Sequence, residues 1–212
     1  MPKPNTGTQY QPDDAYVTEN EPVSIRDKVC DLGRFIDCCR YAILTTHHAS
    51  SGALVSRCMA VAGKENGGLD ILFFTNAESA KVDDIKTDSS VNISFLDESG
   101  QWASLSGTSK VITDRCVLKD HYEKTMKNWP TVRSWLGIFV ADGSDDSRLG
   151  LIRVESKTIT YSTKSHNSLN NAMETAQGLV TGKIPRTNKL CQISEKEILI
   201  WKDSAKMVEM KP

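Results

Sequence analysis

A hydroxyl and an ammonium group stand at the predicted start of a short helix, directly after a buried strand. Phe73–Asn76 has the apolar, β-prone composition of the end of such a strand, and Ser79 and Lys81 follow it closely. The start of a helix presents unpaired backbone N–H groups and the positive end of the helix dipole, which both favour a phosphate. The strand can provide an apolar wall for a flat ring. This spacing predicts a site for a phosphorylated, aromatic small molecule.

Arg57, in the predicted strand upstream, adds a second cation to this set. An arginine in a strand needs an anionic or planar partner or a path to water, and its planar fork binds phosphate at two points. Taken singly, Arg57 is more simply explained as solvent-facing, Lys81 as a solvated helix residue and Ser79 as a plain N-cap. Their combination favours a shared phosphate site.

Other polar and aromatic residues give weaker signals. Trp102 lies on a predicted strand, where packing is a commoner role for tryptophan than stacking on a ligand. His47 and His48 are neighbours on a strand and point to opposite faces, so they cannot chelate one metal ion. We interpret the adjacent pairs Asp83–Asp84 and Asp145–Asp146 as solvated. No Ser–His–Asp or Cys–His arrangement is evident, so the sequence assigns neither a catalytic residue nor a metal site.

The composition of the 212-residue chain, with 39% hydrophobic and 25% charged residues, is that of one soluble globular domain. A formal net charge of −1 gives no overall attraction to nucleic acid or to an anionic membrane. No apolar run is long enough to span a bilayer, and no secretory signal is evident. The six cysteines form no C-x-x-C pair, and although their even number is compatible with disulfides, we expect reduced thiols. We therefore expect a cytoplasmic protein without a nucleic-acid or membrane partner.

The hydrophobic pattern predicts β-hairpins with helices inserted at a few points. Residues 1–22 are rich in Pro, Asn, Asp and Glu and are expected to form a flexible arm. The predicted helices cover residues 25–36, 79–87, 114–127 and 169–177, and the predicted strands cover residues 41–46, 54–61, 69–75, 91–95, 102–112, 149–154 and 158–162. The last two strands are expected to pair around Glu155–Lys157, and Gly107 marks either a bulge or the close approach of a ligand.

Regular hairpins without βαβ alternation favour an antiparallel barrel of six or seven strands with peripheral helices, a mainly β fold of the α+β type. The barrel is assigned to residues 23–165. Residues 166–212 are expected to form a C-terminal helix and a mixed tail packed on the barrel. A separate second domain is not supported.

Several of these segments, taken together and in order, resemble a known family. They are Ala42–Thr46, Ser56–Met59, Phe73–Asn76 with Ser79 and Lys81, Val91–Phe95 and Ser104–Thr108. The chain from about Ser24 to Tyr161 is similar to the FMN-binding split barrels related to pyridoxamine 5′-phosphate oxidase. Within that family it most resembles the bacterial general-stress branch and its fungal blue-light-inducible relatives.

The resemblance implies a homodimer with two FMN sites at the subunit interface. In the family, the segment matching Arg57, Cys58 and Met59 runs along the flavin, and the arginine reaches the phosphate or the ribityl chain. The positions matching Phe74 and Thr75 contact the flavin and its tail. The resemblance thus implies that these five residues bind the cofactor.

The positions matching Ser79 and Lys81 complete the phosphate site of the family. The chain departs from the family pattern elsewhere. Trp102 stands near the position of a flavin-contacting glutamine of the oxidases, so it is kept as a candidate cofactor contact. Ser162 stands where a tryptophan is common, and Met207–Pro212 replaces the Arg-Leu-His segment that grips the substrate. Vitamin-B6 oxidation is therefore weakly supported.

Two functions fit these features best. The first is an FMN-dependent oxidoreductase that passes electrons between a reduced donor and a small acceptor, since the flavin carries the electrons and no strong acid or base is needed. The alternative is a stress or sensor protein that holds FMN without turnover, which the loss of the substrate-gripping tail favours. A flavin-free interaction module, in which Arg57 and Lys81 are surface charges, is a third hypothesis.

Overall fold

The structure, a computed structural model, describes residues 23–128, 143–164 and 188–209. The strands are β1 (Tyr41–His47), β2 (Leu54–Glu65), β3 (Asp70–Asn76), β4 (Ser90–Leu96), β5 (Trp102–Ile112), β6 (Leu149–Lys164) and β7 (Asn188–Ile193). The helices are α1 (Ile25–Cys38), α2 (Ala80–Thr87), α3 (Arg115–Asn128) and α6 (Glu195–Glu209), with a short 3₁₀ turn at Gly143–Asp145. The predicted N-terminal arm over 1–22 and the predicted helix over 169–177 lie outside the described residues.

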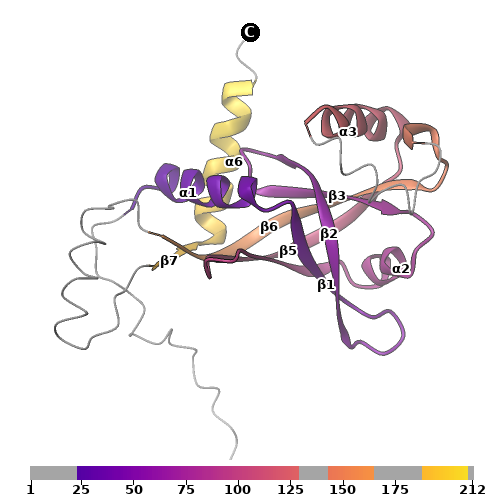
Figure 1. The fold of residues 1–212 in the computed structure, drawn as a ribbon, viewed down its shortest axis with the longest axis horizontal. Helices are drawn as coiled ribbons and strands as arrows, with labels where there is room; N and C mark the ends of the chain where they lie inside the picture. Colours follow the sequence, from indigo (N-terminus) through magenta and orange to yellow (C-terminus); the bar gives the residue numbers. More distant parts are fainter. Residues whose placement is uncertain (1–22, 129–142, 165–187, 210–212) are drawn as a thin grey trace, which may run out of the picture.

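Six of the strands close into a barrel. The sheet order is β3-β2-β1-β4-β5-β6-β7, every pairing is antiparallel, and a further pairing of β3 with β6 completes the ring (Figure 1). The seventh strand, β7, lies outside the ring and pairs with β6. The predicted mainly β fold, with six to seven antiparallel strands and peripheral helices, is confirmed.

The longest strand, β6, joins the barrel to this extension. One of its edges pairs first with β3 and then with β7, and the other edge pairs with β5. The prediction of two strands around Glu155–Lys157 is therefore wrong. The polar middle of β6 stays in the sheet because Ser156 is buried and bonded, with its N–H 3.1 Å from Asp70 Oδ1 and its Oγ donating to Leu69 O at 2.7 Å.

Gly107 lies at a β-bulge between β5 and β6. Lys157 of β6 is an extra residue there, because the residues on either side of it pair with consecutive residues of β5. A Cβ atom on Gly107 would lie 2.1 Å from the backbone oxygen of Glu155, so only glycine fits. Of the two explanations for this glycine, the bulge is the one observed.

The main core fills the inside of the barrel. In β1, β4 and the first part of β5, buried residues alternate with residues on the outer face. In β3 both faces are covered, because Ile71 and Phe73 belong to the barrel core while Leu72 and Phe74 pack under α3. The prediction that this strand is buried on both faces is confirmed.

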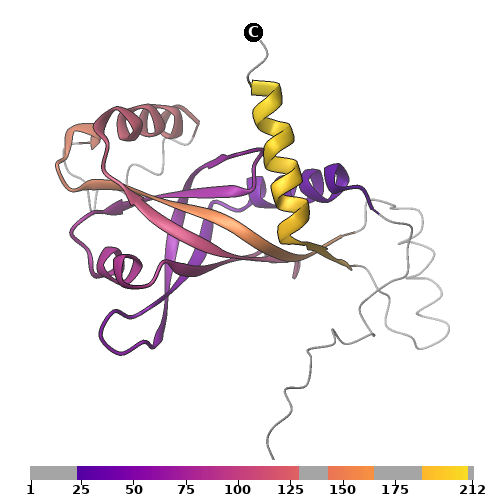
Figure 2. The same ribbon diagram turned by 180° about the vertical axis from the view of Figure 1, so that it is seen from behind.

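The helices lie toward the two ends of the barrel (Figures 1 and 2). At one end α1 lies beside α6, and an ion pair of 2.7 Å joins Lys28 to Glu197. Ser24 caps α1 as predicted, since its Oγ accepts a hydrogen bond from the N–H of Asp27 at 3.2 Å. No helix within the three described ranges combines the length and the apolar character that crossing a bilayer requires.

Helix α6 is fastened to the turn between β2 and β3. The indole N–H of Trp201 donates to Gly67 O at 3.0 Å, and a Cβ atom on Gly67 would lie 2.4 Å from that indole nitrogen. The Lys202 ammonium lies 2.5 Å from the Asp70 carboxylate, whose side chain is 1% exposed. The sequence pattern predicts only a mixed tail here, so β7 and α6 are elements that it did not predict.

Lys202→Met is expected to lower the free energy of unfolding by about 3–5 kcal/mol, because it leaves the buried Asp70 carboxylate without its counter-charge. Urea unfolding followed by circular dichroism measures the change. Lys206→Met, at an exposed lysine of the same helix, is the matched control. The control should stay within about 0.5 kcal/mol of the parent protein. Equal effects of the two substitutions would contradict a role for the ion pair in holding α6.

Candidate functional site

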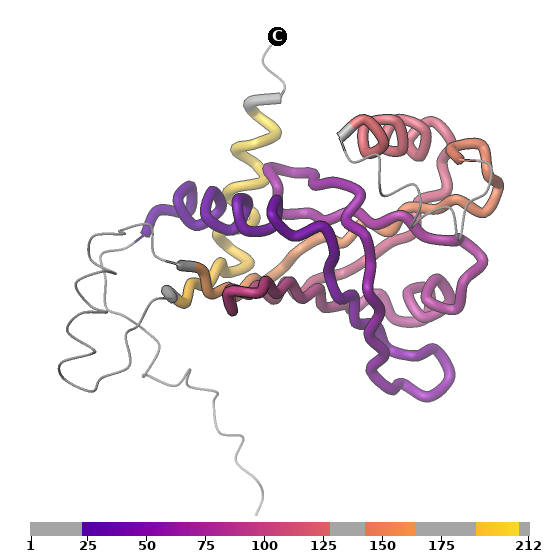
Figure 3. The backbone as a smooth tube through the Cα atoms, viewed as in Figure 1, coloured from indigo at the N-terminus to yellow at the C-terminus, as the bar shows by residue number. Residues whose placement is uncertain are grey.

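The barrel is split where β2 changes its strand partner. Residues 54–60 of β2 pair with β1, whereas residues 61–65 pair with β3. The pairing of β3 with β2 ends at Phe73, so among the described residues no strand occupies the other edge of β2 over 54–60. The chain leaves β3 at this point and enters α2 three residues later (Figure 3). Of the predicted site residues, Arg57 of β2 and Ser79 and Lys81 at the start of α2 come together at this split.

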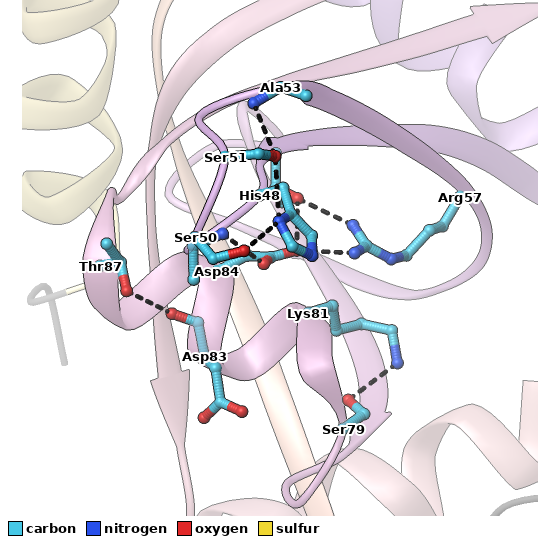
Figure 4. A network of polar contacts seen from close by, with 12 residues as sticks. His48, Ser50, Ser51, Ala53, Arg57, Ser79, Lys81, Asp83, Asp84 and Thr87 are labelled. Atoms are coloured by element: carbon cyan, nitrogen blue, oxygen red, sulfur yellow. Dashed lines mark hydrogen bonds and ion pairs between the residues drawn. The ribbon is translucent and has the colours of Figure 1, made fainter.

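Arg57 lies on the inner face of β2 beside α2 (Figure 4). Its Nη2 donates to Asp84 Oδ2 at 2.6 Å, and its Nη1 donates to Thr46 Oγ1 at 2.8 Å. The side chain is 22% exposed, so the guanidinium is anchored but still open to a ligand on one side. This geometry excludes the simpler explanation of Arg57 as a solvent-facing arginine.

Asp84 is the buried counter-charge of Arg57, with a side chain that is 2% exposed. Its Oδ1 accepts from the N–H of Ala49 at 2.9 Å, and its Oδ2 accepts from Thr46 Oγ1 at 3.2 Å as well as from Arg57. Burial alone would raise the pKa of this carboxyl, but the bonds from Ala49, Arg57 and Thr46 and the charge of Arg57 hold it below its usual range. The carboxylate thus joins α2, β2 and the turn after β1.

The prediction that the acidic pairs are solvated is wrong for one member of each pair. Asp83 is exposed, but Asp84 is enclosed because the turn after β1 folds over α2. Asp146 is buried and lies 2.8 Å from the guanidinium of Arg148. One signal for Asp84 exists in the sequence, since it is three residues after Lys81 and shares its helix face.

Lys81 and Ser79 lie at the start of α2, as predicted. Lys81 Nζ donates to Ser79 Oγ at 2.9 Å, and Ser79 Oγ donates to Asn76 O at 2.6 Å. Ser79 occupies the N-cap position, but its side chain makes no capping hydrogen bond. Burial lowers the pKa of Lys81, and the charge of the neighbouring Arg57 lowers it further.

The Asp84 carboxylate is thus paired with Arg57, whereas Lys81 bonds to the Ser79 hydroxyl, so this group of two cations and one carboxylate carries an excess of positive charge. Burial lowers the pKa of Lys81 most, and the charge of Arg57 adds to the effect; an incoming anion would relieve the repulsion between the two cations. A phosphate monoester is a suitable ligand, because charge-assisted hydrogen bonds from guanidinium and ammonium groups are the stronger kind. The residues present fit the predicted phosphate tail on this ground.

Three other predicted residues surround this group or lie just beyond it. Met59 shares the inner face of β2 with Arg57 and belongs to the barrel core. Thr75 is buried at the end of β3, and its Oγ1 donates to Asn76 O at 3.3 Å. Phe74 points to the other side of β3, where its ring meets Tyr122 of α3 edge-on with centroids 5.9 Å apart.

Cys58 and Trp102 lie on the outer face of the barrel, away from the inner-face group. Cys58 is exposed on β2, opposite Ile43 of β1. Trp102 begins β5, whereas the residue of β5 that bonds to the segment just after α2 is Ser109, whose N–H lies 2.8 Å from Ser89 O. Seven strand residues span about 23 Å. Within one chain, Trp102 is therefore not brought to Lys81.

A cleft of about 950 Å³ opens at the far end of β2. Its walls are the end of α1, residues 61–65 of β2 with the following Asn66, and α3. His121 of α3 lies 3.2 Å from Glu65 Oε1, and Arg153 lies 2.6 Å from the other oxygen of Glu65. The cleft and the phosphate-compatible group are thus two sites along one strand.

Comparison with known proteins places this architecture. The sequence profile described as "Pyridoxamine 5'-phosphate oxidase like" matches residues 27–186. The chain belongs to this family. It is 41% identical over 204 residues to Protein bli-3 of Neurospora crassa, an alignment that covers 94% of this chain and 96% of the relative.

Solved structures agree with the fold. A Clostridium acetobutylicum protein related to general stress protein 26 has a TM-score of 0.55 at 13% identity, covering 83% of this chain and 99% of that one. General stress protein 26 of Bacillus anthracis has a TM-score of 0.50 at 17% identity, covering 63% of this chain and 92% of that one. The family resemblance drawn from the sequence is confirmed.

Acid unfolding is expected to depend on Asp84. Its pKa is lower in the folded protein than the ordinary value, so its contribution to stability is present above about pH 4 and is lost as the pH falls through the lower folded value. The free energy of unfolding of the parent protein should fall more steeply in this acid range than that of Asp84→Asn. Urea unfolding at a series of pH values measures both slopes, and parallel curves would contradict the assignment.

Proposed function

We propose that this protein is a flavoprotein that binds FMN, and that Arg57, Lys81 and Ser79 hold the phosphate of the FMN. The observation that carries the proposal is the placement of a second cation, Lys81, with a lowered pKa, beside the Arg57–Asp84 ion pair at the split of the barrel. A dianionic tail supplies the charge that this group lacks. The family to which the chain belongs is compatible with this ligand.

The flavin ring is proposed to lie along the free edge of β2. Backbone N–H and C=O groups on an unpaired strand edge can bond to the polar rim of a flat ring. Met59 and Thr75 line the same region and, with Cys58 and Phe74 of the same strands, complete the proposed contacts. Along β2, the distance from Arg57 to position 61, where the cleft begins, is about 13 Å. A ring placed along this stretch would extend from the phosphate group toward the cleft.

A homodimer is part of the proposal. Four large apolar residues are exposed on the outer face of neighbouring strands β1, β4 and β5: Tyr41, Ile43, Leu96 and Trp102. Contiguous apolar surface of this kind is typical of a protein–protein interface. A second copy seated on this face would cover these side chains and bring its own Trp102 near the first copy, which gives this residue a place in a site shared by two chains.

The proposed activity is electron transfer between a reduced donor and a small acceptor. Bound FMN supplies the redox chemistry. The residues of this chain hold its phosphate, cover its ring and leave the cleft beyond β2 for the second reactant. The alternative is an FMN-binding stress or sensor protein without turnover, which would hold FMN through the same residues.

The absorbance spectrum of the purified protein tests the binding proposal first. Flavin bands, or their appearance after reconstitution with FMN, are expected. A colourless protein that does not bind added FMN would contradict the proposal and favour the flavin-free interaction module. Anaerobic reduction by NADH or NADPH, followed by reoxidation with a panel of acceptors, then separates the enzyme from the non-catalytic alternative.

Lys81→Ala is expected to weaken FMN binding by about 1.5–3 kcal/mol, the contribution of a hydrogen bond to a charged group. Binding of riboflavin, which lacks the phosphate, should change little. Lys86→Ala, at an exposed lysine of the same helix, is the control. Fluorescence titration measures the affinities of the parent and of both variants for FMN and for riboflavin. An unchanged affinity of Lys81→Ala for FMN would remove Lys81 from the phosphate site.

Leu96→Asp is expected to convert the dimer to a monomer and to reduce FMN retention, because it places a charge within the apolar face. Leu54→Asp is the control, because the two leucines are similarly exposed, Leu54 at 69% and Leu96 at 73%. Leu54 lies away from the apolar face, at the far end of β1 and β2, opposite His47. Light scattering gives the mass of each variant. A parent protein that is monomeric and still binds FMN tightly would contradict the shared site.

A further inference from the structure

We propose that Asp84 is a positioning residue, which holds the guanidinium of Arg57 in the orientation that receives the phosphate. The proposal rests on the proposed function, because it concerns the same phosphate site. Asp84 belongs to α2 and Arg57 to β2, so the contact fixes the relative position of the two elements on which the cations are mounted.

The Asp84 carboxylate has little freedom to move. Its Oδ1 is bonded to the N–H of Ala49, and its Oδ2 is bonded to both Arg57 and Thr46. The turn that carries Ala49 is braced in its own right, since Ser50 Oγ and Ser51 Oγ lie 3.2 and 3.1 Å from His48 Nδ1 (Figure 4). The carboxylate is therefore a fixed point against which a flexible side chain can be oriented.

Arg57, Thr46 and Asp84 form a closed ring of hydrogen bonds. Arg57 donates to Thr46 and to Asp84, and Thr46 donates to Asp84. Two terminal nitrogens of one planar group are thus held at two points, which fixes the plane of the guanidinium. An arginine carries five N–H donors, so this ring leaves others for a ligand. Ordering a long side chain before binding reduces the entropy that binding must overcome.

A different role for Asp84 predicts the opposite result. A carboxylate beside Arg57 and Lys81 repels a phosphate, so if its charge alone mattered, neutralising it would strengthen FMN binding. If orientation matters more, neutralising it weakens binding. The hydrogen bonds that Asp84 accepts already compensate much of its charge, and its place in the ring is the feature that a neutral side chain cannot reproduce.

The test compares FMN and riboflavin binding by Asp84→Asn and by the parent protein. Asp84→Asn is expected to weaken FMN binding about tenfold, as loss of a partner that orients a metal ligand does at metal sites, and to leave riboflavin binding unchanged. Asp83→Asn, at the exposed neighbouring carboxylate, is the matched control and should bind both ligands like the parent. Unchanged or tighter FMN binding by Asp84→Asn would overturn the proposal.

Thr46→Val provides a second route, because it opens the ring and keeps the Asp84 charge. Like Asp84→Asn, it should weaken FMN binding, so the test remains available if Asp84→Asn does not fold. Unchanged FMN binding by Thr46→Val would overturn the proposal.

Combining Arg57→Gln with Asp84→Asn should add little to the effect of Arg57→Gln alone, whereas additive effects would show that Asp84 acts independently of Arg57. If the parent does not prefer FMN over riboflavin, the proposed function fails; if it does and only these variants behave otherwise, the positioning role alone fails.

Discussion

A charged group that leaves water needs a partner in the protein, and the Arg57–Asp84 ion pair meets this need at the split of the barrel. The pair forms only if β2, α2 and the turn after β1 reach their final places together, because each supplies one of its contacts. The same pair leaves Lys81 as the second cation of the site, with its pKa lowered by burial and by Arg57. Local stability and anion affinity therefore depend on one interaction.

The two ends of the barrel use similar chemistry for different purposes. At one end the buried Asp70 carboxylate binds Lys202 and fastens α6 to the turn after β2. At the other end the buried Asp84 carboxylate binds Arg57, but here a second cation stands nearby and the edge of β2 is open. The first arrangement compensates its charges and braces the fold. The second leaves positive charge unbalanced, which suits it to bind an anionic ligand.

Much of the fold could be predicted because its signals are local. Period-two alternation marks β1, β4 and β5, a continuous apolar run marks β3, and Ser24 marks the start of α1. The continuity of β6 depends on contacts between Ser156 and the distant Leu69 and Asp70, which no local pattern shows. Helix α6 did carry a local signal, a capping box in which Ser194 N–H donates to Glu197 Oε2 at 2.9 Å.

In the site too, some residues could be predicted from local signals and others depend on distant contacts. Arg57, Ser79 and Lys81 could be chosen by residue type and order, whereas Asp84 has the same side chain as the exposed Asp83 and is set apart by its helix face and by the turn that folds over it. The most direct test of the account is a crystal structure of the protein with FMN. The account predicts phosphate oxygens within hydrogen-bond distance of both Arg57 and Lys81, with the Arg57–Asp84 pair intact. A phosphate bound elsewhere, or an Arg57 that leaves Asp84 to reach it, would contradict the account.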